Sequence, residues 1–282
     1  MKVLPFKIPK PENEALIYQE DKEVQFYNRL HQHAEIQISY IKSGEGSLVI
    51  GDSITDYNTG DIIVVGSNIP HVFNSDIGSN KPSFMMTLFF TNDSFGEGFF
   101  DLNEFRSLKR FFKQSAFGMK LLSNKKSLAS HFLKLKKATK LERFILLFEI
   151  MKLINKSKTQ QISSFVYQKH YKDNEGKRMS AVFNYTMSHF NQDITLDKIA
   201  SVASMTTNAF CKYFKQRTNK TYFQLLNEVR IEHACKLLNR DRDLSVAEVA
   251  LQSGFHNISN FNRKFKVVKH MTPTTYRKFI LT

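Results

Sequence analysis

Two stretches near the carboxyl end of the chain repeat one order of apolar and polar positions. The first runs from Thr195 to Lys215 and the second from Ser245 to Lys266. In each, a Thr or Ser stands where a helix N-cap belongs, and apolar residues follow at helical spacing up to a turn of small residues. A second short helix then carries two Phe residues four positions apart. This order predicts two helix-turn-helix units.

The second helix of each unit has an apolar face and a polar face. We expect Phe210 and Phe214, and likewise Phe261 and Phe265, to point into the core. The opposite faces suit a major groove, because Arg can pair with guanine and Asn with adenine. A merely solvated face is the alternative for either helix alone, and the repeat favours DNA. The outward residues are Asn208, Cys211, Lys212 and Lys215, then Ser259, Asn260, Asn262, Arg263 and Lys266.

Between the two units, residues 221–238 carry apolar residues at helical spacing and predict one long amphipathic helix. Such a helix fixes the spacing of the two units. If the spacing is about one duplex turn, roughly 34 Å, both second helices can enter successive major grooves. If it is shorter, the duplex must bend. Residues 178–190 predict a further helix in front of the first unit.

The front of the chain follows a period of two. Residues 35–41 alternate, turns follow at 43–46 and 51–52, and short apolar runs recur at 47–50, 62–65, 70–73 and 84–90. Short strands at this spacing predict a small antiparallel barrel. Beyond residue 94 the pattern predicts helices over 99–112 and 140–154. The second of these is apolar almost all round, which favours packing on the barrel, a helix–helix dimer interface, or both.

Charge and composition refine this picture. The net charge is +15, yet residues 1–95 hold 7 Lys and Arg against 12 Asp and Glu, whereas residues 176–282 hold 17 against 7. A basic back half suits a partner that carries phosphate. The two cysteines, Cys211 and Cys235, indicate no disulfide framework. With neither a signal peptide nor a membrane span in the pattern, we expect a cytoplasmic protein without a membrane partner.

From about Arg178 to the end, the chain resembles the AraC-type transcription regulators. The similarity lies in Ile199-Ala200, Phe214-Lys215, Leu237-Leu238, Gly254-Phe255, Phe265-Lys266, Thr272-Pro273 and Tyr276-Arg277. The resemblance implies a seven-helix module that binds promoter DNA and usually activates transcription. By position it implies base contacts from Asn208, Cys211, Lys212, Ser259, Asn262 and Arg263, although a Cys more often packs than reads bases. We also expect Thr206, Arg230 and Arg277 to contact DNA. The sequence departs from the family at Asn219-Lys220 and Lys269-His270, where Gly is common.

Residues 20–92 resemble, more loosely, the cupin-type sensor domain that precedes many AraC-type modules. By strand parity His31, His33, Glu35 and Gln37 share a face that His71 can approach. Three interpretations of these residues are possible: a divalent metal site, a polar pocket for a small organic effector, or purely structural histidines. Metal-binding cupins place a Glu where this chain has Gln37 and Ile38. We therefore expect these five residues to bind an effector, with no metal and no cofactor.

The predicted fold class is multidomain α+β. A cupin-like effector-binding barrel (1–95) precedes a helical linker and dimerisation region (96–160), a flexible linker (161–176) and an all-α module with two helix-turn-helix motifs (177–282). The predicted function is a sequence-specific transcription regulator, an activator rather than an enzyme. Its expected partners are double-stranded promoter DNA, RNA polymerase, a small-molecule effector and a second copy of the chain. The alternatives are a metal-dependent cupin enzyme fused to a DNA-binding module, and a front domain that only dimerises.

Overall fold

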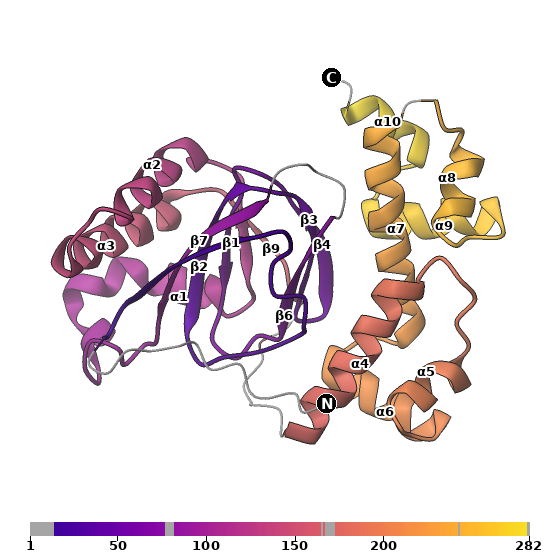
Figure 1. The fold of residues 1–282 in the computed structure, drawn as a ribbon, viewed down its shortest axis with the longest axis horizontal. Helices are drawn as coiled ribbons and strands as arrows, with labels where there is room; N and C mark the ends of the chain where they lie inside the picture. Colours follow the sequence, from indigo (N-terminus) through magenta and orange to yellow (C-terminus); the bar gives the residue numbers. More distant parts are fainter. Residues whose placement is uncertain (1–13, 77–81, 165, 167–172, 242, 281–282) are drawn as a thin grey trace. The chain divides into compact units, whose positions relative to one another are not determined.

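The computed structural model describes residues 14–76, 82–164, 166, 173–241 and 243–280. The chain divides into two compact units, Met1–Asp173 and Asn174–Thr282 (Figure 1). The first, called here the front unit, combines strands with three α-helices. The second, the rear unit, is helical. The helical stretch 96–160 that we predict as a separate region belongs to the front unit.

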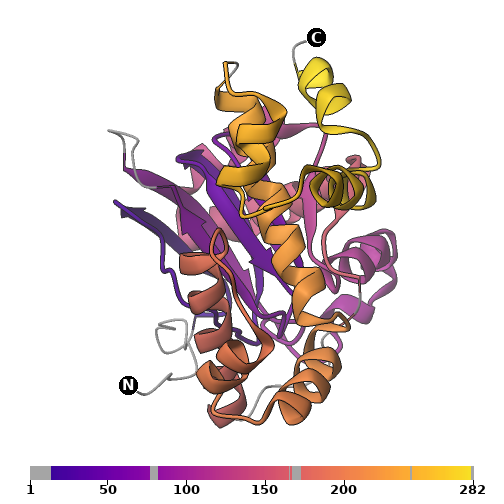
Figure 2. The same cartoon turned by 90° about the vertical axis from the view of Figure 1, so that its right-hand side faces the viewer.

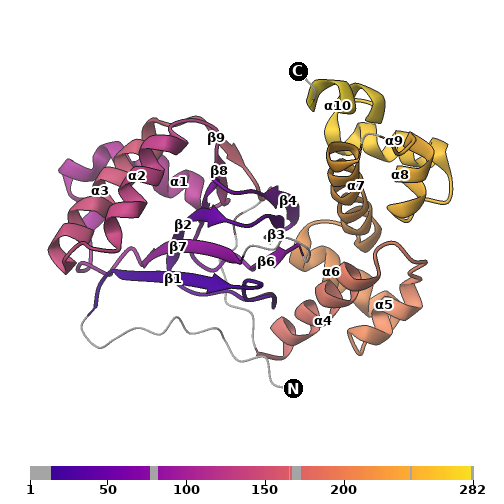
Figure 3. The ribbon, with the colours of Figure 1, turned by 45° about the horizontal axis from the view of Figure 1, so that its top comes forward.

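Within the described part of the front unit the strands form two antiparallel sheets, which confirms the predicted β-fold. In Figure 3 β1, β7 and β2 lie side by side in the larger sheet. The smaller sheet has the order β4 (Ser53–Tyr57), β3 (Gly46–Ile50) and β6 (His71–Ser75). The larger sheet has the order β1 (Ile17–Glu23), β7 (Ser83–Phe90), β2 (Ile36–Ser43), β5 (Ile62–Val65), β8 (Met119–Leu121) and β9 (Thr159–Gln161).

The larger sheet is buried on both faces. On one face Ile38 of β2 joins the side chains of β5, β7 and three α-helices in a single core. On the other face Ile41 packs against the smaller sheet, together with Leu48 and Phe73. Because successive side chains of a strand point to opposite faces, Gln37 and Ser39 share the inner face with Ile41. The alternation of residues 35–41 therefore separates an apolar outer row from a partly polar row inside the barrel.

Helices α1, α2 and α3 cover the outer face of the larger sheet (Figure 1). The predicted helix over 140–154 is confirmed as α3 (Lys140–Lys156), whose capping box pairs Thr139 with Glu142. The continuous helix predicted over 99–112 is wrong. That stretch holds two short 3-10 helices, η1 (Phe99–Asp101) and η2 (Asn103–Leu108), followed by α1 (Lys109–Ser115), and α2 spans Lys125–Leu135.

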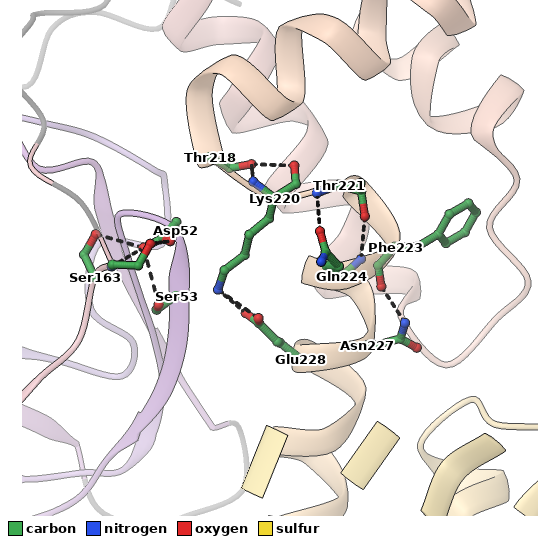
Figure 4. Close-up of polar contacts among 11 residues, drawn as sticks. Asp52, Ser53, Ser163, Thr218, Lys220, Thr221, Phe223, Gln224, Asn227 and Glu228 are labelled. Atoms are coloured by element: carbon green, nitrogen blue, oxygen red, sulfur yellow. Dashed lines mark hydrogen bonds and ion pairs between the residues drawn. The ribbon is translucent and has the colours of Figure 1, made fainter. Parts of the chain in front are cut away.

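The end of the front unit is held by Asp52, which is fully buried in the turn between β3 and β4. Its carboxylate accepts hydrogen bonds from the Ser163 hydroxyl and the Ser164 backbone N–H, both at 2.8 Å, and from the Ser164 hydroxyl (Figure 4). The first residues of the predicted linker 161–176 are therefore packed. Residues 165 and 167–172 of that linker lie outside the described residues, and α4 begins at Asp173.

Seven helices form the described part of the rear unit, as the family resemblance implies. Helix α7 runs between two pairs of short helices, α5 with α6 and α8 with α9 (Figure 2). Thr195 and Ser245 cap helices as the sequence predicts, and Thr206 and Thr221 are further N-caps. The helices are α4 (Asp173–His189), α5 (Leu196–Val202), α6 (Thr207–Thr218), α7 (Tyr222–Arg240), α8 (Val246–Gln252), α9 (Ile258–Lys269) and α10 (Pro273–Ile280).

Each helix-turn-helix turn needs one residue in the left-handed region. Ser204 takes that conformation in the first helix-turn-helix motif, with φ of 53°, and Gly254 takes it in the second motif, with φ of 83°. The helices α6 and α9 also end on left-handed residues, Asn219 at φ 55° and His270 at φ 57°. Asn and His thus terminate these helices where the family often has Gly, and both turns form.

Buried aromatic residues join the short helices to α7. Phe210 and Phe214 of α6 are fully buried and contact the ring of Tyr222, at the start of α7. Phe261 and Phe265 of α9 are also fully buried, in a core that includes Ala234 and Cys235 further along α7, and thus confirm the predicted inward faces. Lys269 adds an ion pair to Glu232, at 2.6 and 2.7 Å. Closer to α6, Lys220 pairs with Glu228 (Figure 4).

Candidate nucleic-acid interface and effector site

Helix α6 exposes the polar face that the sequence assigns to DNA. Asn208, Cys211, Lys212 and Lys215 are all exposed. The hydroxyl of Thr206 accepts a hydrogen bond from the Ala209 backbone N–H, so this residue caps the helix that it precedes. The Thr207 hydroxyl donates to the Asp197 carboxylate at 2.6 Å and fixes α6 against α5. We call the four exposed side chains the first recognition face.

Helix α9 exposes a matching face. Ser259, Asn260, Asn262, Arg263 and Lys266 are all exposed and form what we call the second recognition face. The Arg263 guanidinium donates to the Asn260 side-chain oxygen at 2.9 Å, which orients it along the helix. Asn257, which the sequence analysis did not single out, caps α9 by accepting from the Asn260 backbone N–H at 3.0 Å. An Asn just before a helical pattern is the signal that could have identified it.

Two arginines predicted to contact DNA make hydrogen bonds within the rear unit. The Arg230 side chain donates to the backbone carbonyls of Phe190 and Gln192, at 2.7 and 2.9 Å. The Arg277 guanidinium donates to the Leu244 carbonyl at 2.7 Å. Both side chains are half-buried and connect segments that are distant in the sequence. We therefore leave them out of the proposed interface.

In the front unit, His31, His33 and His71 come together as expected, although His31 and His33 precede β2 and His31 pairs with His71 through an isolated bridge. One potential ligand atom from each histidine lies within 4.8 Å of the others. Backbone hydrogen bonds in both directions between His31 and His71, at 3.1 and 2.8 Å, hold two of these residues opposite each other. Asn68 donates its backbone N–H to the His33 carbonyl at 2.8 Å. The three rings are therefore positioned by their own backbones.

Gln37 faces the cluster, whereas Glu35 does not. The Gln37 side-chain oxygen lies 3.2 Å from His33 Nε2 and 3.1 Å from His71 Nε2. A Glu35 carboxylate oxygen lies 3.6 Å from Nδ1, on the opposite edge of the His33 ring. The grouping of Glu35 with the effector residues is therefore not supported by the geometry, because residue 35 precedes β2 and strand parity does not hold there.

A row of buried polar groups, which the sequence analysis did not assign to the site, continues from Gln37. Its amide donates to the Ser39 hydroxyl at 2.9 Å, and Ser39 is hydrogen-bonded to the Thr87 hydroxyl at 3.0 Å. Ser39 and Thr87 are fully buried. Thr87 interrupts an otherwise apolar run in β7, and that break in the pattern is the signal that could have identified it, whereas Ser39 follows the alternation of β2 like any other inward position.

Burial keeps the three histidines neutral. It lowers the pKa of His31 to about 4, lowers the pKa of His33, and lowers that of His71 well below its usual value, with His31 and His33 adding to the effect on His71. In each ring Nδ1 faces a backbone carbonyl, so Nδ1 carries the proton and Nε2 carries a lone pair. The carbonyls belong to Arg29, Glu35 and Ile69, at 2.8 to 2.9 Å.

Acid is expected to destabilise the metal-free front unit. In the unfolded chain these histidines take up protons as the pH falls through about 6.5, whereas burial in the folded unit lowers the pKa of all three, that of His31 to about 4. Proton uptake then favours the unfolded chain. The free energy of unfolding of the front unit should therefore fall as the pH drops through this range, and change little at higher pH. Hydrogen exchange of front-unit amides in chelator-treated buffer measures this. Constant protection between pH 7 and 5 would contradict the neutral assignment.

The comparisons with known proteins cover both units. Residues 14–135 match the AraC-like ligand binding domain, and residues 199–278 match a helix-turn-helix domain. The uncharacterized HTH-type transcriptional regulator YdeC of Bacillus subtilis (strain 168) is 35% identical over 101 residues, which are 36% of this chain and 34% of that protein. An uncharacterized HTH-type transcriptional regulator of Staphylococcus aureus (strain COL) is 32% identical over 100 residues, 36% of this chain and 13% of that protein. The match thus spans about a third or less of each relative.

Two solved structures are also similar. A DNA-binding transcriptional dual regulator from Escherichia coli K-12 is 25% identical, covers 41% of this chain and 98% of its own, and has a TM-score of 0.34. ToxT from Vibrio cholerae O395, bound to (E)-4-(8-methylnaphthalen-1-yl)but-3-enoic acid, is 16% identical, covers 95% of this chain and 100% of its own, and has a TM-score of 0.38.

Within the described residues, no helix is both long enough and apolar enough to cross a bilayer. The two matched domains follow one another in the order that the sequence resemblance implies, and together they take in both the histidine cluster and the two recognition faces. The chain therefore belongs to the AraC-type transcription regulators.

Proposed function

We propose that this chain binds double-stranded promoter DNA in a sequence-specific way through the first and second recognition faces. The observation that carries the proposal is the pair of exposed faces on two capped helices of equal length, each anchored to α7 by two buried Phe residues. Arg263, Asn262 and Asn208 have the donors and acceptors that read base edges, whereas Lys212, Lys215 and Lys266 suit phosphate.

The spacing of the two faces favours a bent duplex. Helix α7 has 19 residues and is therefore about 28 Å long. Since α6 packs near Tyr222 and α9 near Ala234, the two anchor points are closer than the full length of the helix. One duplex turn is roughly 34 Å, so a straight duplex would not present two successive major grooves at the right separation. We infer that bound DNA bends toward the rear unit.

For the front unit we propose an effector site at His31, His33, Gln37 and His71. The cluster combines buried polar groups with an aromatic surround, which includes Phe89 beside His33 and Phe73 beside His71. Binding there would change how the rear unit engages DNA or a second copy of the chain. RNA polymerase is the proposed downstream partner, with activation as the outcome. Family membership favours this regulator over the metal-dependent enzyme considered from the sequence.

A second copy of the chain is the proposed occupant of a groove between α2 and α3. The groove has a volume of about 680 Å³ and is lined by apolar residues, among them Leu133 and Ile145, and by charges of both signs. Lys134, Lys137 and Glu142 supply these charges, so the same patch on a copy related by a two-fold axis offers complementary partners. The side chains of Leu133 and Ile145 are 49% and 51% exposed, which leaves them available for a partner.

Ile145→Asp is expected to weaken self-association of the chain at least about tenfold, because it places a carboxylate in the centre of that apolar patch. Sedimentation velocity across a concentration series measures this. Val24→Asp is the matched control, since Val24 is also exposed in the front unit but lies outside the groove. Equal self-association of wild type and Ile145→Asp would remove the groove from the proposal.

The DNA proposal is tested by selecting genomic fragments with the purified full-length chain at near-physiological salt. We expect an enriched motif with two short blocks about one helical turn apart, and an affinity that falls steeply as salt increases. Salt-sensitive binding without any enriched motif would contradict sequence-specific recognition by this chain alone.

A further inference from the structure

We propose that His31, His33 and His71, together with the side-chain oxygen of Gln37, bind a divalent first-row transition-metal ion. The proposal names the chemical class of the effector in the proposed regulator, and in that respect it rests on the proposed function. The ligand set itself stands on the geometry of the front unit alone.

The donor atoms converge on a volume of the size of one ion. Because the three histidine atoms lie within 4.8 Å of one another, some point lies within about 2.8 Å of all three. Metal–nitrogen bonds are about 2.0–2.1 Å, so side-chain shifts of less than about 1 Å complete the coordination. The distances of 3.1 and 3.2 Å from Gln37 Oε1 to two Nε2 atoms equal the roughly 2.9–3.4 Å that separates neighbouring ligands around such an ion.

The hydrogen bonds on the far side of each ring prepare all three histidines as ligands. Each Nδ1–H donates to a backbone carbonyl, and that contact fixes both the tautomer and the ring orientation. The Nε2 atoms of His33 and His71 then face the Gln37 oxygen, which is also an acceptor. A cation among these lone pairs satisfies them together.

The ligand types select the metal. Three neutral imidazoles suit Zn²⁺, Fe²⁺, Ni²⁺ or Cu²⁺, whereas Mg²⁺ and Ca²⁺ prefer oxygen ligands. Sets of three histidines hold Zn²⁺ in other proteins. Gln37 supplies a fourth, neutral ligand, and its amide donates to Ser39 at 2.9 Å, which keeps the oxygen toward the cluster. Gln37 stands where metal-binding cupins have Glu, which is why the sequence alone favours no metal, yet a carboxamide oxygen can also coordinate.

The surroundings allow an ion to enter and then shield it. His71, Gln37 and His33 are 0%, 3% and 4% exposed, whereas His31 is only half-buried and marks the side of entry. The ring of Tyr27 packs edge-on against His31 at 5.1 Å, and Phe89 packs edge-on against His33 at 5.5 Å. An apolar shell of this kind limits the access of water to the site and lowers the local dielectric.

Calorimetric titration of the full-length metal-free chain with Zn²⁺ alone, and with Co²⁺ alone as a spectroscopic probe, tests the proposal. We expect one ion per chain, and visible Co²⁺ absorption typical of low coordination with nitrogen ligands. His31→Gln is expected to weaken binding at least about 100-fold. Since His31 is half-buried, this variant should fold, and circular dichroism confirms it. His71→Gln serves as the second variant, and His131→Gln, a histidine elsewhere in the front unit, is the matched control.

The outcomes separate this inference from the proposed function. Absence of tight Zn²⁺ or Co²⁺ binding by the folded wild type overturns the metal site, as does binding that His31→Gln and His71→Gln leave unchanged. Neither result affects sequence-specific binding of duplex DNA, which is measured on the same samples. Conversely, tight metal binding by a chain that recognises no DNA motif would support the site and overturn the proposed function. A change in duplex affinity when Zn²⁺ is added identifies the ion as the effector.

Discussion

Replacing Arg263 with Ala is expected to lower the affinity of the full-length chain for its preferred duplex by about 1–3 kcal/mol, roughly 5- to 150-fold. The loss should be concentrated at one base pair of the site. Arg263 lies on the exposed face of α9, and its guanidinium is held by Asn260 at 2.9 Å, an arrangement suited to bidentate contact with a guanine. Competition binding against duplexes that carry every single substitution measures both the affinity and the position.

Lys264→Ala is the control for that experiment, because it removes one cation from the same helix at a half-buried position. We expect it to lower the affinity for all sequences alike, or to leave it unchanged. If Arg263→Ala also weakened every duplex equally, its role would be contact with phosphate rather than base recognition. If it changed nothing, α9 would not be the helix in the groove.

Replacing Gly254 with Ala is expected to destabilise the rear unit by about 2–5 kcal/mol. With φ of 83°, this glycine takes a conformation that side chains disfavour. A Cβ would also lie 2.8 Å from both the Phe190 carbonyl oxygen and the Asn191 Cα, and 2.9 Å from the Arg230 Nε. Two of these neighbours are backbone atoms, so the turn itself has to move, and with it the position of α9.

Hydrogen exchange read by peptide mass measures this effect, since the chain has no Trp to serve as a fluorescence probe. Protection should fall in α8 and α9, and DNA affinity should fall with it. Ser204→Ala is the matched control, because Ser204 occupies the equivalent turn of the first helix-turn-helix motif and already carries a Cβ at φ 53°. We expect a change below about 1 kcal/mol there. Unchanged protection in Gly254→Ala would show that the turn does not depend on glycine.

Local pattern was enough to predict the rear unit. The N-caps, the helical spacing and the paired Phe residues are all short-range signals, and the same order occurs twice. The buried positions of Phe210, Phe214, Phe261 and Phe265 follow directly from that spacing. The left-handed turns at Asn219 and His270 required the structure, since neither residue type specifies that conformation as strongly as Gly does.

The front unit depends on contacts that local pattern does not encode. Strand β1 runs over Ile17–Glu23, mostly polar residues with few strand formers, and it forms only because β7 pairs with it. Strands β8 and β9 have three residues each and join the larger sheet from the segment that we predicted as helical. The helix predicted over 99–112 breaks because Phe99, Phe100 and Phe105 pack together in a cluster rather than along one helix face.

The candidate site residues likewise differ in whether local sequence pattern could place them. The exposed residues of α6 and α9 could be placed from helical spacing. His31, His33 and His71 meet as expected, yet strand parity does not explain it, because His31 and His33 precede β2 and His31 reaches His71 through an isolated bridge. Arg230 could not be placed, because its role depends on Phe190, forty positions away, whose carbonyl it binds. Glu35 was misplaced because it lies just before β2, where the alternation of faces has not yet begun.

Hydroxyl-radical footprinting on the selected DNA motif tests the central claim, that two helices of one rear unit read two blocks of sequence. We predict two protected blocks about one turn apart on one side of the duplex. The variant Asn208→Ala/Lys212→Ala should lose protection of one block and Arg263→Ala that of the other. A single protected block, or loss of both blocks in either variant, would contradict two independent readers.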